Sequence, residues 1–406
     1  MNRLRAISGD FRRVLLATLF FGAAAGIIAS TLNNYLADVH GFDASARGWL
    51  ELPRELPGFV IMFVVALLLL RLRESRMAAV AMVFTGAGLL GLGYLTPTTA
   101  VLVAWIVIWS LGDHIIFAVE GPLGLKLARH GGEGRRLGQL GGARNLGTIG
   151  GVAVVWLLAK LVGDRYDLFY LAGGLCAAAA GVFYWRLTLG HGEPPSRKLV
   201  YRREYHLFYA ISALFGIRKQ IFLVFGTWVL VSLHGVPVAT IAMLYFVAAA
   251  LGVILRPLLG DVIDWLGERR VLAADEVLLL AVCLVYAFAS DVLPEPWDLR
   301  LLYGAYVLDS VLFALRVART TYLKKIAVDP TDITPTISLG ITIDHLVAMS
   351  LPVLSGWIWE RYGHQWVFVL AGAIAVVGFF VCLRIRVPAG PTPTAAPAPL
   401  PGGGAA

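Results

Sequence analysis

The chain has 406 residues, of which 58% are hydrophobic and only 15% are charged. A soluble protein of this length needs more charge to cover its surface, since typical soluble chains carry about 25% charged residues. The net charge of +8 does not indicate nucleic-acid binding, because the basic residues lie in short clusters at alternate ends of apolar runs.

Apolar runs of about 20 residues, each long enough to cross a hydrocarbon layer, recur along the whole chain. The first, Val14 to Leu32, follows a basic stub. It is too long for the apolar part of a signal peptide and predicts a first membrane helix. The expected helices span residues 13–36, 48–70, 77–95, 99–127, 137–161, 167–188, 206–233, 238–259, 271–290, 299–323, 335–358 and 366–386. The sequence therefore predicts an all-α polytopic membrane protein with twelve transmembrane helices.

The expected helices form two groups of six. They predict an N-terminal bundle over 1–190, a linker over 191–205, a C-terminal bundle over 206–387 and a tail over 388–406. The tail consists mainly of Pro, Ala and Gly, a composition with nothing to bury, and we expect it to be disordered.

The two halves look like copies of each other. At an offset of 194 residues, Gly22 falls on Gly216 and Gly58 on Gly252. Because each half begins and ends on the same side, the repeats are parallel. Parallel repeats place a binding site at their interface near the midplane, and rocking of the halves exposes it alternately to the two sides.

Basic residues mark one side of the predicted membrane. Clusters such as Arg12-Arg13, Arg135-Arg136 and Arg269-Arg270 alternate with connections that are mixed in sign or acidic. This positive-inside pattern predicts a multi-pass protein of the cell (inner) membrane with both termini in the cytoplasm.

The chain offers little for catalysis. Cys176, Cys283 and Cys382 each lie in an apolar run, without pairing or metal-ligand spacing. The sequence also lacks a nucleophile–base signature and a phosphate-binding loop. We therefore expect no cofactor, no metal and no enzymatic activity. A membrane sensor or an embedded enzyme is the least favoured alternative.

One connection carries a family resemblance. The segment Gly260-Asp-Val-Ile-Asp264-Trp-Leu-Gly267-Glu-Arg269-Arg270, between the eighth and ninth helices, resembles the G-x3-D-x2-G-x-R-R loop of the major facilitator superfamily. With twelve helices and the 6+6 repeat, the resemblance covers residues of about 10 to 386. It implies the fold of that superfamily and a gating role for Gly260, Asp264, Gly267, Arg269 and Arg270.

The resemblance also implies a charge contact between Asp264 and the cytoplasmic end of the fifth helix, where Arg135, Arg136 and Arg144 are available. The first half departs from the family pattern, since its equivalent loop, RLRESR, lacks both Gly and Asp. The fifth helix lacks the proline of the signature that many proton-driven drug exporters carry. Drug efflux is therefore a less favoured interpretation.

Ionisable residues inside a bilayer are candidates for function, because burying a charge there is costly. The substrate-binding candidates are Arg218, Lys219, Arg316, Arg319, Arg144, Asn145 and Asn33. Several arginines near the midplane would favour an anionic solute such as a carboxylate or a phosphate ester. Alternatively, these cations pair with Asp113, Glu120, Asp309 and Asp344 and fix helix packing.

Acidic residues and histidines form a second set of candidates. Asp113, His114, Glu120, Asp309, Asp344 and His345 are predicted to bind and release the coupling proton. A structural role is the alternative for each. The stretch ELPRELPG, with Glu51, Arg54 and Glu55, is interpreted as an irregular helix start in preference to an outer gate. Glycines 134, 138 and 142, and 147 and 151, give the fifth helix small faces for close packing.

The sequence thus predicts a monomeric secondary transporter for a small, anionic organic solute, coupled to protons or another ion. An exporter of drugs or cationic metabolites, with the acidic residues as binding charges, is the alternative. In either case the partners are the solute, the coupling ion and the lipid bilayer.

Overall fold

The computed structural model describes residues 9–68, 72–128, 133–188 and 201–387, and its regular elements are all helices. The linker is described only from residue 201 onward, and the tail lies outside the described residues. The first half contains α1 (Gly9–Asp38), α2 (Ala44–Leu68), α3 (Glu74–Tyr94), α4 (Thr99–Lys126), α5 (Glu133–Val162) and α6 (Tyr166–Trp185).

The second half repeats this plan with three interruptions. It contains η2 (Arg203–Tyr205), α7 (His206–Ile221), η3 (Phe222–Gly226), η4 (Val229–Leu233), α8 (Val238–Leu266), α9 (Glu268–Val292), α10 (Trp297–Leu312), η5 (Phe313–Arg316), α11 (Val317–Ile326), η6 (Pro330–Asp332), α12 (Ile333–Tyr362) and α13 (His364–Cys382). The segments η3 and η4 are π-helical turns that continue α7. The 3₁₀ turn η5 joins α10 to α11.

The helices of the described part of the chain agree with the predicted all-α membrane protein. Within the described residues, eleven helical segments are long and apolar enough to span a bilayer, with α10, η5 and α11 together forming one of them. The remaining long helix is α2, whose first part carries Arg47, Glu51, Arg54 and Glu55. The protein is therefore a multi-pass membrane protein.

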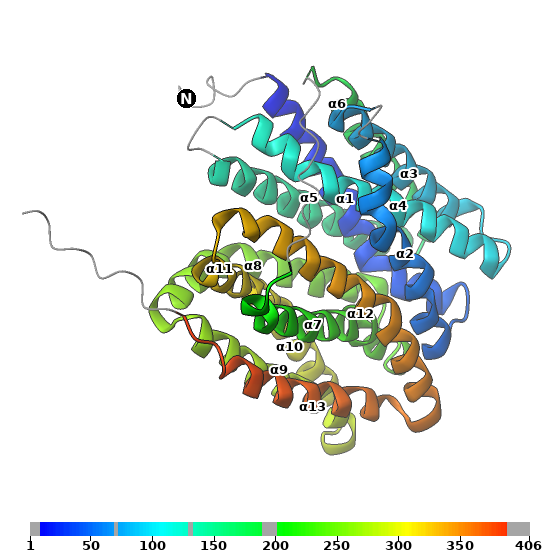
Figure 1. The fold of residues 1–406 in the computed structure, drawn as a ribbon. Coiled ribbons are helices and arrows are strands. Elements are labelled where there is room, and N and C mark those ends of the chain that lie inside the picture. Colours follow the sequence, from blue (N-terminus) through cyan, green and yellow to red (C-terminus); the bar gives the residue numbers. More distant parts are fainter. Residues whose placement is uncertain (1–8, 69–71, 129–132, 189–200, 388–406) are drawn as a thin grey trace, which may run out of the picture.

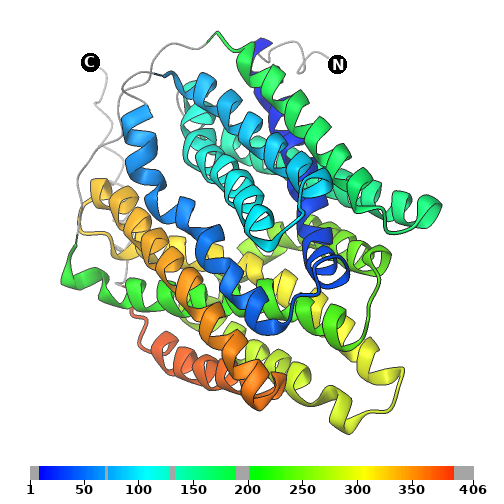
Figure 2. The same cartoon turned by 90° about the vertical axis from the view of Figure 1, so that its right-hand side faces the viewer.

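The helices lie in two bundles. Figure 1 shows α1 to α6 in blue to green on one side and α7 to α13 in green to red on the other, and Figure 2 shows the same division from a second direction. Glycines permit close approach within a bundle. A Cβ at Gly22 would overlap the carbonyl oxygen of Arg144, and one at Gly151 would overlap that of Ala23. Close backbone contact of this kind drives helix packing in membranes.

The bundles meet near one end of the molecule, at the connection between α1 and α2. There Asn34 Nδ2 donates to the Val236 carbonyl (2.8 Å), and the Ala44 amide donates to the Glu360 carboxylate (3.0 Å). A Cβ at Gly48 would overlap the carbonyl oxygen of Pro352, so α2 and α12 are in backbone contact. We call this the closed end. The opposite end, where α1 begins and α13 finishes, is the termini end.

Candidate transport site

A cavity between the bundles extends from the middle of the molecule toward the termini end. Its volume is about 420 Å³. On α8 its lining runs from Tyr245 to Ile263, about 27 Å along the helix at about 1.5 Å per residue. Asn145 and Thr148 of α5 line the facing wall.

A smaller cavity of about 190 Å³, the inner cavity, lies next to it, and the two share Tyr245, Ser310 and Phe313 as lining residues. The charged residues that line the pair of cavities are Arg218, Lys219, Arg316 and Asp309. Three cations and one carboxylate therefore face this space.

Arg218 is held at the inner cavity by two carboxylates. Its Nη1 lies 2.6 Å from Asp275 Oδ2, and its Nη2 lies 3.2 Å from Asp309 Oδ1. All three residues come from different helices, α7, α9 and α10, and Arg218 is only 5% exposed. Charge-assisted hydrogen bonds of this kind offset the cost of burying a guanidinium. The contact with Asp309 is one of the ion pairs expected under the alternative interpretation, in which the cations fix helix packing.

Lys219 forms the next pair. Its Nζ lies 2.6 Å from Asp344 Oδ2 on α12. Asp344 Oδ1 is buried and, among the described residues, has no hydrogen-bond partner. Adjacent residues on α7 thus tie this helix to α9 and α10 on one side and to α12 on the other.

A second charged network lies on α2. The Glu51 carboxylate accepts hydrogen bonds from Arg47 (2.6 Å) and Arg54 (2.5 Å), and from Gln220 of the other half (2.6 Å). Glu51 is fully buried. Asn33, predicted to contact substrate, accepts from Arg47 Nε at 2.7 Å and is buried with this network.

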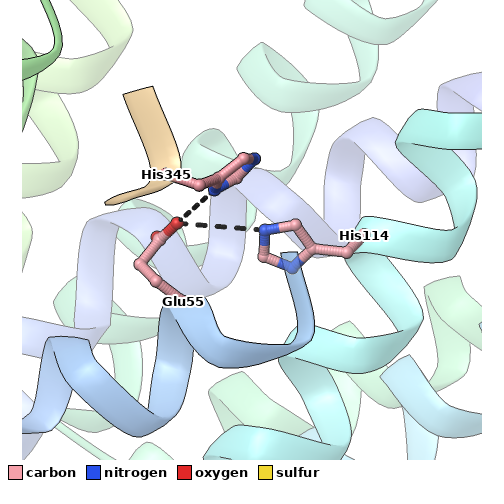
Figure 3. A group of neighbouring side chains, drawn as sticks. All are labelled: Glu55, His114 and His345. Atoms are coloured by element: carbon pink, nitrogen blue, oxygen red, sulfur yellow. Dashed lines mark hydrogen bonds and ion pairs between the residues drawn. The ribbon is translucent and has the colours of Figure 1, made fainter. Parts of the chain in front are cut away.

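Glu55 links both halves through two histidines (Figure 3). Its Oε1 lies 2.6 Å from Arg54. Its Oε2 lies 2.9 Å from His345 Nδ1 and 4.0 Å from His114 Nε2. His114 and His345, predicted separately from the sequence, therefore face the same carboxylate.

The remaining acidic candidates lie within the first half. Glu120 forms an ion pair with Arg144 and accepts a hydrogen bond from Thr18 at 2.9 Å. Asp113 accepts from Thr85 of α3 at 3.2 Å. Although Asp113 and Glu120 are seven residues apart on α4, they contact different helices.

Two further arginines lie on η5 and α11. Arg316 is exposed on the wall of the larger cavity, with its guanidinium 5.4 Å from the Phe313 ring. Arg319 stacks on Phe215 at 3.7 Å, and among the described residues its buried Nε has no hydrogen-bond partner. Asn145 lines the same cavity from α5.

The loop motif has the expected backbone but no latch contact. Gly267 turns the chain between α8 and α9 with φ of +80°, a conformation that favours glycine. Asp264, Arg269 and Arg270 are exposed, and Gly260 lines the larger cavity. Among the described residues Asp264 forms no ion pair, and Arg144 pairs with Glu120 instead. In this conformation the expected contact between Asp264 and the fifth helix is not formed.

Glu51, Arg54 and Glu55 were interpreted from the sequence as part of an irregular helix start, and Arg47 and Asp275 were not among the predicted site residues. Arg47, Glu51 and Glu55 are spaced by four residues and Arg54 follows Glu51 by three, which places them on one helix face. That spacing inside a predicted span was the available signal. Asp275 could not be found in this way, because its ion-pair partner, Arg218, lies on another helix and far away in the sequence.

The family model described as Major Facilitator Superfamily matches residues 14–315. No curated protein matches the sequence significantly. Among solved structures, a mutant of the nucleoside transporter NupG aligns with a TM-score of 0.75 at 16% identity, over 93% of this chain and 100% of that one.

Two other structures align along most of their length. A bacterial homolog to the human lysosomal transporter Spinster, in an inward-facing and unoccupied conformation, has a TM-score of 0.71 at 13% identity, covering 92% of this chain and 95% of that one. A D-xylose-proton symporter has a TM-score of 0.68 at 14% identity, covering 92% and 97%. At these identities the likeness concerns the fold.

Proposed function

The chain belongs to the major facilitator superfamily, and from that premise we propose that it moves a small anionic organic solute across a membrane by alternating access. The observation that carries the proposal is the position of Arg316 on the wall of the paired cavities, beside Arg218 and Lys219, whose charges are offset by Asp275, Asp309 and Asp344. The guanidinium of Arg316 offers a two-pronged donor to a carboxylate or a phosphate ester in this cavity.

Within this proposal the cations have different tasks. Arg218 and Lys219 already face carboxylates, so they fix the helices around the inner cavity and supply a positive wall. Arg316 lies on the wall of the larger cavity and meets the solute first. Arg319 lies about one helical turn further along, stacks on Phe215 and is not among the residues that line the two cavities.

Coupling to protons or another ion is proposed at the contact between the halves. Asp344 and His345 are adjacent on α12 and face Lys219 and Glu55. Because carboxylates and imidazoles change charge on binding a proton, protonation here would alter the contacts that hold α2 and α7 against α12. Asp309 is the corresponding candidate beside Arg218.

We further propose that the termini end faces the cytoplasm of a cell inner membrane. The basic clusters Arg12-Arg13, Arg269-Arg270 and Lys324-Lys325 lie at this end, in agreement with the positive-inside rule. The structure then corresponds to an inward-open state, in which the larger cavity is reached from the cytoplasm.

Purified chain in proteoliposomes tests the solute class. Under an imposed pH gradient we expect saturable flux of at least one labelled carboxylate or phosphate ester, competed by related anions. The Arg316→Ala variant should reduce this flux at least tenfold. Arg300→Ala is the matched control, because Arg300 lies on α10 but stacks on Trp297 outside the cavities. Equal flux in the two variants would contradict the anion site.

The alternative, export of drugs or cationic metabolites, receives less support. Asp309, Asp344 and Glu120, its candidate binding charges, each face a cation in the structure. Flux that is competed by lipophilic cations and is insensitive to anions would favour it. A chain that folds but shows no flux of any solute would favour the sensor or embedded enzyme.

A further inference from the structure

Three side chains at the interface between the halves converge on one point. Glu55 comes from α2, His114 from α4 and His345 from α12 (Figure 3). One ligand atom of each lies within 4.8 Å of the others. In a tetrahedral site with metal–ligand bonds of about 2.0–2.1 Å, neighbouring ligand atoms are about 3.3 Å apart. The separations of 2.9 Å and 4.0 Å from Glu55 Oε2 to the two imidazoles bracket that value.

The orientation of His114 prepares it for a metal ion. Its Nδ1 lies 2.8 Å from the Ser110 carbonyl oxygen. A carbonyl oxygen only accepts, so Nδ1 carries the hydrogen and the Nε2 of the neutral ring presents a lone pair toward Glu55. Ligating histidines in metal sites are held in this way, with the second ring nitrogen donating to a carbonyl or carboxylate. His114 Nε2 and Glu55 Oε2, both electron-pair donors, are then 4.0 Å apart. A cation between them would be attracted by both.

Gly58 leaves space for the imidazole rings of His114 and His345. A Cβ on Gly58 would overlap His114 Nε2 and approach His345 Cε1 to 2.8 Å. The rings of the two histidines lie 5.2 Å apart between centroids. Glycine at this position on α2 thus leaves both imidazoles free to turn toward Glu55.

The surrounding charges leave room for a cation. Arg47 and Arg54 are the cations on the α2 side, and they face Glu51, Glu55 and Asp113. Lys219, which also faces Glu55, is matched by Asp344. With neutral imidazoles and all of these carboxylates ionised, the groups sum to one negative charge. Glu55 keeps Oε1 on Arg54 and has Oε2 for an ion.

We infer that Glu55, His114 and His345 form a binding site for a divalent transition-metal ion of the Zn²⁺ class that joins the two halves. Imidazole and carboxylate ligands suit such ions, and three protein ligands leave a fourth position for water. Ligation replaces the Nδ1 proton of His345, and the neutral ring then carries its one hydrogen on Nε2.

A metal ion at this place would control the gate. Alternating access requires α12 to separate from α2 at the closed end, which takes His345 away from Glu55 and His114. An ion bound to all three opposes that separation, because binding stabilises the state that holds the full ligand set. The ion therefore acts as an inhibitor that keeps the closed end shut.

Binding of Zn²⁺ to the full chain in detergent, after removal of metals, tests the site by titration calorimetry with a competing chelator. We expect one ion per chain. The His114→Gln and His345→Gln variants should each lower the affinity at least tenfold. His364→Gln is the control, since His364 lies at the start of α13 and near the closed end but outside the triad. Thermal unfolding without metal checks that each variant is folded.

A distance measurement tests the gate without a known solute. Spin labels at Val39→Cys and Tyr362→Cys, both exposed residues of opposite halves, should show a shorter and narrower distance distribution when Zn²⁺ is added. The same labels in the His345→Gln background should not respond. Equal Zn²⁺ affinity in the parent chain and the histidine variants, or an absence of stoichiometric binding, would overturn the inference. Neither outcome bears on the solute proposed for the cavities.

Discussion

Each buried charge of the inner cavity has a partner on another helix. Arg218 lies between Asp275 and Asp309, and removing it leaves two carboxylates in a low-dielectric interior. Removing one member of a buried ion pair is far more costly than replacing the whole pair, because the remaining charge is uncompensated. The residue therefore holds the arrangement of α7, α9 and α10 whatever its role in transport.

The Arg218→Met variant should consequently destabilise the protein by about 3–5 kcal/mol, the usual cost of leaving a buried charge without its partner. Combining it with Asp275→Asn and Asp309→Asn should restore most of the loss, since no uncompensated charge remains. Thermal unfolding of the parent chain, the single variant and the triple variant in detergent measures the effect. A triple variant less stable than Arg218→Met alone would contradict the pairing.

At the scale of elements, glycine decides which faces of α5 pack. A Cβ at Gly147 would overlap the carbonyl oxygen of Leu19, so α1 and α5 touch through their backbones. Gly138, on the same helix, has no heavy atom near the position of a Cβ among the described residues. The sequence predicted small faces at both places, but spacing alone does not distinguish a packed face from an exposed one.

We therefore expect opposite results from two identical substitutions. Gly147→Ala should lower stability by about 1–3 kcal/mol, because the added methyl forces the two helices apart. Gly138→Ala should be neutral or stabilise by up to about 1 kcal/mol, since alanine favours the helix and meets no neighbour. Thermal unfolding of the two variants measures both effects. Equal melting temperatures for Gly147→Ala and Gly138→Ala would argue against the close approach of α1 and α5.

Interruptions of helices lie next to the candidate site. The π-helical η3 includes Phe222, which lines the smaller cavity, and the 3₁₀ turn η5 ends at Arg316 on the larger one. Departures from α-helical hydrogen bonding are frequent at functional positions and hinges. No sequence pattern indicated them, because Phe222 and Phe313 fit an unbroken apolar run equally well.

The fold was more predictable than the site. Twelve apolar runs and the loop around Gly267 indicated the architecture, since the length of a membrane helix is set by the bilayer. The pairing of Arg218 with Asp275, or of Glu55 with His345, depends on how helices rotate against each other. Residue spacing within one helix contains no information about the facing helix.

At the scale of the whole molecule, the two bundles behave as bodies joined at one end. Contacts across the interface gather where α2 meets α7 and α12, with Glu51–Gln220, Glu55–His345 and Ala44–Glu360 as examples. The larger cavity lies on the other side of these contacts and extends toward the termini end. Transport by rocking therefore requires the closed end to open.

A cross-link across the closed end should stop transport. In a background without Cys176, Cys283 and Cys382, a short bismaleimide between Asp43→Cys and Glu360→Cys would join α12 to the residue that precedes Ala44, whose amide binds Glu360. We expect flux in proteoliposomes to fall at least tenfold after cross-linking, while binding of solute from the termini end persists. The matched control joins Asp38→Cys to Asp164→Cys, two nearby residues at the same end but within one half, and should leave flux unchanged. Unaltered flux in the first protein would mean that the halves do not separate there, because a covalent bridge permits no such movement.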